Sequence, residues 1–212
     1  MAIDFGNVLG ETSTAAQSVP ETSAGSTGII LDLKKNPVLD LTKRNPGLEK
    51  ILVGAGWDVA TNGRDFDLDL TAFLLHSGKI TSGEDVIYFG HKKGNGIFLN
   101  KDNRTGAGEG DDEMIEVELS KLDSSVTEVV FCIVIYEAKE KGQTFGHVKN
   151  ARVHLVNQEN KQEMGMFQLN TDYSTDTAII FSKLVRNGSE WDYKAIGEGK
   201  QADLNDLAAY FS

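Results

Sequence analysis

The sequence has very little cysteine. Its 212 residues include one, Cys132, so the chain cannot form an internal disulfide and must be held together by packing. Cys132 lies in the apolar run Val129–Tyr136, and we expect a small core side chain there. A reactive thiol would need an electropositive, partly exposed setting. One cysteine and four histidines without HxxxH or HxH spacing also argue against a structural zinc site.

Long apolar runs are also missing. The longest uninterrupted run is near eight residues, against the roughly 20 that are needed to span a bilayer. The N-terminus has neither the basic nor the apolar region of a signal peptide. We therefore expect a cytoplasmic protein that does not insert into membranes.

Positive charge is scarce, since 21 Lys and Arg face 32 Asp and Glu and give a formal net charge of −11. Nucleic-acid phosphates are contacted by clustered Lys and Arg, so this balance argues against a general nucleic-acid binder. No GxSxG, P-loop or GxGxxG motif lies at a strand-to-helix junction. An acidic surface suits cations instead.

The chain divides into two regions. Residues 1–27 are rich in Ser, Thr, Ala and Gly, which predicts a flexible leader. Residues 28–212 contain about ten short segments that are β-branched or alternate between apolar and polar, whereas only Asp203–Phe211 and Ser120–Ser125 have helical character. This predicts one mainly β domain, an antiparallel β-sandwich of two sheets with a few short helices. The expected strands are 28–33, 51–57, 66–71, 86–89, 97–99, 114–119, 129–136, 151–156, 164–169, 178–185 and 191–196.

Two of these segments allow more specific structural predictions. Ile51–Trp57 contains Gly54 and Gly56, which predicts a bulge or a close backbone approach. Val129–Tyr136 is β-branched and aromatic throughout, which predicts a central strand covered on both faces.

Negative charge is densest in the segment Asp102–Glu113, where five acids and Arg104 give a net charge of −4 over twelve residues. Ca²⁺ takes six to eight oxygens from carboxylates, backbone carbonyls and water, and glycine-rich backbone can turn its carbonyls inward. The segment is not an EF-hand, because Arg104, Gly106 and Ala107 stand where that loop needs Asp or Asn, Asp or Asn, and Gly. A calcium loop and a solvated acidic loop both stay open at this point.

A second acidic cluster is Asp65-Phe66-Asp67-Leu68-Asp69. If the apolar residues face the core, Asp67 and Asp69 share the opposite face, about 6.7 Å apart at Cα. Two carboxylates at that spacing could converge on one cation or lie between two. The alternative is a plain solvent-facing strand edge, and Asp58 is a third, weaker candidate ligand.

Seven motifs, in order along the chain, carry a family resemblance. They are Gly54–Asp58, Phe66–Leu75, Asp102–Glu113, Ile135–Ala138, Gln143–Ala151, Asp176–Phe181 and Trp191–Gly197. They resemble the TerD family of tellurite-resistance and stress-response proteins, and the resemblance covers about residues 28 to 199. It implies a β-sandwich of a bacterial or phage-associated cytoplasmic protein that binds two Ca²⁺ ions and has no established catalytic activity.

The resemblance also implies a set of metal-binding residues. The family usually has an acid where this chain has Ala107, a loss expected to weaken one of the two sites. The implied side-chain ligands are Asp67, Asp69, Asp102, Asp111, Asp112 and Glu113, with carbonyl ligands from Gly106 and Gly108, and Asn103 completes the candidate set.

These observations predict a calcium-binding, non-enzymatic stress-response protein that acts through calcium-dependent stabilisation and by binding protein partners, such as other stress or tellurite-resistance proteins. We expect a monomer or weak oligomer. One alternative is a structural or assembly module that is held together by bound Ca²⁺, and the leader is the feature that favours it. The other is a metal-dependent hydrolase, although the sequence supplies no clear general base or basic phosphate clamp near the acids.

Overall fold

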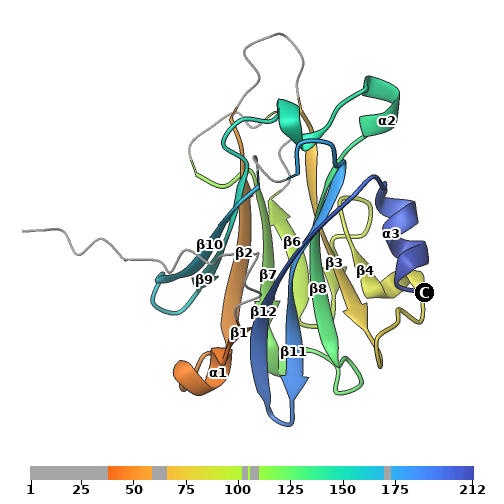
Figure 1. Cartoon of the computed structure of the whole chain (residues 1–212). Helices are drawn as coiled ribbons and strands as arrows, with labels where there is room; N and C mark the ends of the chain where they lie inside the picture. The colour runs from red at the N-terminus through yellow and green to blue at the C-terminus, as the bar shows by residue number, and fades with distance from the viewer. Residues whose placement is uncertain (1–37, 59–65, 102–104, 106–109, 170–172) are drawn as a thin grey trace, which may run out of the picture.

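The chain forms two antiparallel sheets that face each other, as the computed structural model in Figure 1 shows. The structure describes residues 38–58, 66–101, 105, 110–169 and 173–212. Within these residues each sheet has six strands, which confirms the predicted β-sandwich with few short helices. The expected strand 28–33 and the leader lie outside the described residues.

In both sheets, strands that are far apart in the sequence lie side by side. The first sheet runs β1 (Val38–Leu39), β12 (Glu190–Lys200), β11 (Ala178–Asn187), β8 (Glu128–Ile135), β3 (Leu68–Leu75) and β4 (Val86–Ile87). The second sheet runs β10 (Glu163–Gln168), β9 (Arg152–Asn157), β2 (Lys50–Gly56), β7 (Glu113–Glu118), β6 (Ile97–Lys101) and β5 (Lys93–Gly94). The α-helices are α1 (Leu41–Arg44), α2 (Ala138–Lys141) and α3 (Leu204–Tyr210).

The central strand β8 is buried on both faces, as its sequence predicts. It pairs with β3 on one side and with β11 on the other. Cys132 is fully buried, and this burial raises the pKa of its thiol, so it is a core residue as expected. Alternate side chains of β8 belong to two clusters: Val129, Phe131, Ile133 and Ile135 to the core between the sheets, and Val130, Cys132 and Val134 to a cluster on the outer face of the first sheet.

Helix α3 covers that outer cluster. Leu207 and Phe211 pack into it, and the Phe211 ring lies 4.8 Å from the ring of Phe73 on β3. The helix begins after Asp203, whose carboxylate accepts a hydrogen bond from the backbone N–H of Asp206 at 2.9 Å. The predicted helix at 203–211 is therefore confirmed, and its burial explains why β3 is apolar on both faces towards its C-terminal end.

Several short elements were not expected from the sequence. They are β1, α1, β5 and α2, each two to four residues long and therefore too short to show a hydrophobic period. Ser120–Ser125 contributes only the end of a single 3₁₀ turn, Leu119–Lys121. No helix in the described part of the chain is long and apolar enough to cross a bilayer.

A core substitution tests the packing of α3. Leu207→Ala removes a fully buried side chain from the outer cluster and should lower the free energy of unfolding by about 2–5 kcal/mol. Urea unfolding followed by circular dichroism measures this change. Asn205→Ala, at an exposed position of the same helix, is the control and should change stability by less than about 0.5 kcal/mol. Equal effects of the two substitutions would show that α3 does not pack as described.

Candidate metal centre

The described acids of the two segments lie at one end of the sandwich. In Figure 1 the start of β3, the end of β6 and the start of β7 all lie at the upper end, away from α1. Strand β3 belongs to the first sheet, and β6 and β7 belong to the second. A hydrogen bond joins the sheets here, because the Leu70 N–H donates to Glu113 Oε2 at 2.8 Å. We call this region the acidic end.

On β3 the expected alternation is confirmed. Leu68 and Leu70 are fully buried in the core between the sheets, so Asp67 and Asp69 have the opposite orientation. Asp69 is nonetheless only 7% exposed, which excludes a plain solvent-facing strand edge for this residue. The carbonyl of Asp67 accepts a hydrogen bond from the Tyr136 N–H at 2.8 Å.

Neighbouring negative charges affect the pKa of the Tyr136 phenol. The charge of Glu137 is the largest influence, followed by burial and a hydrogen bond to Glu137, and the charges of Asp69 and Asp67 add to it. Together they raise the pKa of Tyr136 above its ordinary value. Asp67 and Asp69 therefore both lie near enough to Tyr136 to contribute to this shift, although less than Glu137 does.

The three consecutive acids Asp111, Asp112 and Glu113, the last of which begins β7, contact three different parts of the molecule. Asp111 Oδ2 lies 2.7 Å from His154 Nε2. Asp112, 2% exposed, accepts a hydrogen bond at Oδ2 from the Trp57 N–H at 3.1 Å. Glu113, 1% exposed, bonds to Leu70 across the sandwich. Three repelling neighbours are thus separated by anchors on three different strands or strand ends.

The anchor of Asp111 is a histidine held between two carboxylates. His154 lies on β9 directly opposite Gly54 of β2, and its Nδ1 lies 3.1 Å from Glu163 Oε2 on β10. A Cβ at Gly54 would clash with the Asp111 carboxylate and with His154 Nε2. The predicted close approach at this glycine is therefore confirmed. Burial lowers the pKa of His154, but the bonds and charges of Asp111 and Glu163 outweigh it, and the net shift is upward.

Sequence reasoning missed His154 as part of this end of the molecule. It lies 43 residues from Asp111, and its position in β9 between inward-facing Val153 and Leu155 predicts only an outward side chain. The sequence feature that points to this contact is Gly54, because a glycine inside a strand predicts a close approach but does not identify the residue that makes it. Asp58, the weaker candidate, is exposed and accepts a hydrogen bond from Asn150 Nδ2 at 2.6 Å, so its carboxylate braces the adjoining loop.

The remaining candidate ligands, Asp102, Asn103, Gly106 and Gly108, lie outside the described residues. Among the residues that the structure does describe, no three His, Cys, Asp or Glu side chains are grouped so that they could hold a metal ion by themselves.

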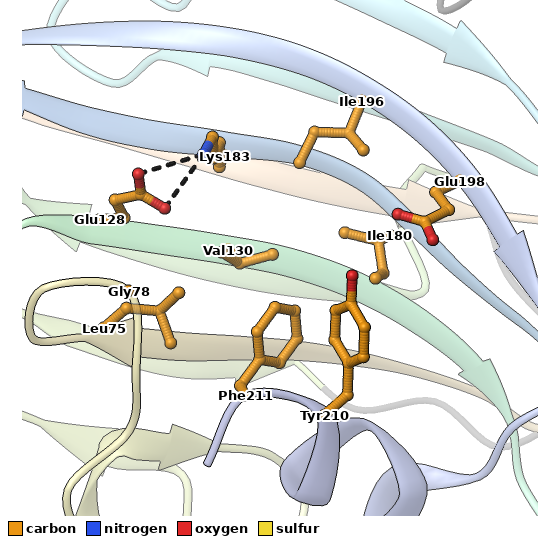
Figure 2. A pocket seen from close by; sticks show the side chains of 10 residues that line it. All are labelled: Leu75, Gly78, Glu128, Val130, Ile180, Lys183, Ile196, Glu198, Tyr210 and Phe211. Carbon is orange, nitrogen blue, oxygen red and sulfur yellow. Dashed lines mark hydrogen bonds and ion pairs between the residues drawn. The ribbon is translucent and has the colours of Figure 1, made fainter.

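A separate pocket lies on the outer face of the first sheet, under the end of α3 (Figure 2). It encloses about 450 Å³, and Val130, Ile180 and Phe211 contribute to its apolar lining. Its carboxylates are paired with lysines, Glu128 with Lys183 at 3.0 Å and Glu198 with Lys200 at 2.7 Å. The pocket contains none of the candidate metal ligands.

Comparison with known proteins identifies the family. The family model described as the TerD domain matches residues 29–211. The chain belongs to the TerD family. It is 44% identical over 183 residues to General stress protein 16U of Bacillus subtilis (strain 168), covering 84% of this chain and 95% of that protein. It is 37% identical over 185 residues to Tellurium resistance protein TerD of Serratia marcescens, covering 85% and 96%.

A solved structure is similar over the same domain. The protein of unknown function SAV2460 is 28% identical, with a TM-score of 0.66, and the match covers 76% of this chain and 95% of that one. The TerD resemblance inferred from the seven motifs is thus confirmed. Both acidic clusters of this TerD-family chain lie inside the matched region.

The bond between the sheets can be tested at Glu113. Glu113→Ala deprives the buried Leu70 N–H of its acceptor and should lower the free energy of unfolding by about 1–3 kcal/mol relative to Glu113→Gln. The glutamine keeps an amide oxygen that can accept the same bond, and both variants lose the same charge. Urea unfolding in a chelating buffer measures the difference, and identical stabilities of the two variants would show that the bond does not hold the sheets together.

Proposed function

We propose that this TerD-family chain binds Ca²⁺ at the acidic end and acts in the stress response through calcium-dependent stabilisation and by binding protein partners, without catalysing a reaction. One observation carries the proposal. Acids of β3 and of the chain that leads into β7 lie at the same end of the sandwich, where the Leu70 N–H bonds to Glu113, and Asp69, Asp112 and Glu113 are almost fully buried there.

Burial of these carboxylates in the ionised form costs free energy. An ionised carboxylate that is removed from water needs hydrogen bonds or opposite charge to offset the lost hydration. Backbone N–H groups of Trp57 and Leu70 supply part of this compensation, since each donates to one carboxylate oxygen. A bound cation would add opposite charge at this end of the sandwich, and it would also screen the repulsion between neighbouring acids.

The donor set fits a hard cation. The described candidates Asp67, Asp69, Asp111, Asp112 and Glu113 all offer carboxylate oxygens, which Ca²⁺ prefers. In the proposal, Asp102 and Asn103 and the carbonyls of Gly106 and Gly108 complete the coordination of two ions.

The stress role is supported by the names of two relatives, a general stress protein and a tellurium resistance protein. The sole thiol, Cys132, is fully buried and therefore not accessible to a soft tellurium species. We therefore assign the stress role to protein partners that recognise the calcium-ordered surface, and not to direct tellurium chemistry.

Calcium should stabilise the protein, and this can be measured as a shift in Tm. A ligand that binds only the folded state adds about 2.7 kcal/mol of stability at a hundredfold excess over Kd. Thermal melting of chelator-treated protein with increasing Ca²⁺ should therefore show a rising Tm. Asp69→Asn removes a buried charge from the acidic end and should reduce the rise.

The matched control is Asp192→Asn on β12, near the opposite end of the first sheet, which should leave the calcium-dependent rise unchanged. A Tm that does not respond to Ca²⁺ would refute the proposed metal site. Light scattering on the same samples separates calcium-dependent ordering of a monomer from calcium-stapled assembly.

A further inference from the structure

We propose that His154 is a positioning residue for the calcium site: it holds the Asp111 carboxylate against Gly54 in a fixed orientation, ready to accept a cation. The inference rests on the proposed calcium function and adds a residue that no ligand motif contains. His154 is not proposed as a ligand.

Both nitrogens of the His154 ring are engaged, which fixes the ring itself. Nε2 lies 2.7 Å from Asp111 Oδ2, and Nδ1 lies 3.1 Å from Glu163 Oε2. Rotation of the ring would break both contacts at once. Because Glu163 belongs to β10 and His154 to β9, the arrangement ties Asp111 to the paired outer strands of the second sheet.

Gly54 of β2 lies against the same carboxylate. Its neighbours Val53 and Ala55 face the core between the sheets, so position 54 faces outward, towards the Asp111–His154 pair. Any side chain there would occupy the space of the carboxylate and the ring. The carboxylate is therefore confined by His154 on one side and by the backbone of β2 on the other.

This confinement matters because of where Asp111 lies in the sequence. It is followed directly by Asp112 and Glu113, whose charges repel it, and it precedes β7 at the end of the 102–109 segment. The two oxygens of a carboxylate have about four acceptor sites between them, so contact with His154 at Oδ2 does not prevent Asp111 from coordinating a cation. Holding it in place before the cation arrives lowers the ordering cost of binding.

Two isosteric substitutions separate the two contacts of the His154 ring. The side-chain amide of glutamine places its nitrogen close to the position of His Nε2, so His154→Gln keeps a donor to Asp111 and loses the contact with Glu163. Asparagine places its nitrogen close to the position of Nδ1, so His154→Asn keeps the contact with Glu163 and loses the donor to Asp111. Both variants are neutral and both remove the imidazole ring.

Isothermal titration with Ca²⁺ alone measures the affinity of each variant, and melting in chelator measures its metal-free stability. Loss of a partner that orients a metal ligand typically weakens metal binding by about 10- to 100-fold. We expect this loss for His154→Asn and an affinity within about threefold of the wild type for His154→Gln, with similar melting temperatures of the two variants in chelator.

A double-mutant cycle shows whether His154 acts through Asp111. In an Asp111→Ala background, His154→Asn should cause no further loss of affinity. If the single His154→Asn variant folds poorly, His154→Gln decides, because it keeps a donor to Asp111: an affinity within about threefold of the wild type supports the role of His154, and a loss of about 10-fold or more overturns it.

The outcomes separate this inference from the function beneath it. Wild-type protein that does not bind Ca²⁺ overturns the proposed function and the inference with it. Wild-type protein that binds Ca²⁺, together with equal affinities of the asparagine and glutamine variants or an additive loss in the Asp111→Ala background, overturns the role of His154 alone.

Discussion

The hydrogen bond from the Leu70 N–H to the buried Glu113 carboxylate is the interaction on which the acidic end depends. Strand β4 pairs with β3 only at Ala72 and Phe73, so it does not reach Leu70. An N–H at an uncovered strand edge needs another acceptor, and here the acceptor comes from the opposite sheet. This fixes the start of β7 against the start of β3, so that Glu113 and Asp69 lie at the same end of the sandwich.

The same constraint governs the neighbouring acids. The carboxylates of Asp111, Asp112 and Glu113 contact His154, the Trp57 N–H and the Leu70 N–H respectively. The pattern suits a site that must stay folded while it carries concentrated negative charge. Elsewhere the chain treats acids differently: Glu128 and Glu198 are each paired with a lysine beside the outer pocket. Among the described contacts of Asp111, Asp112 and Glu113 are two backbone N–H groups and one histidine.

Much of the fold could be predicted from periodicity. The apolar and acidic alternation of β3 and β7 identifies their inward faces, and the continuous apolar run of β8 indicates burial on both sides. Short elements such as β5 and α1 could not be predicted, because two to four residues carry no period. The candidate ligands were found by composition and by family resemblance, but their separation into three directions was not, because adjacent residues in a loop have no fixed relative orientation.

The sequence by itself determined the sandwich, the buried strand β8 and the concentration of acids in two segments, since local alternation and composition are written into neighbouring residues. Only the tertiary structure decided which residues meet. Glu113 contacts Leu70 because the two sheets face each other. Asp111 contacts His154 because β2 separates β7 from β9, and Gly54 of β2 has no side chain to fill the space between the two residues. Such contacts depend on strand order and register across 43 residues in both cases, and no local pattern specifies them.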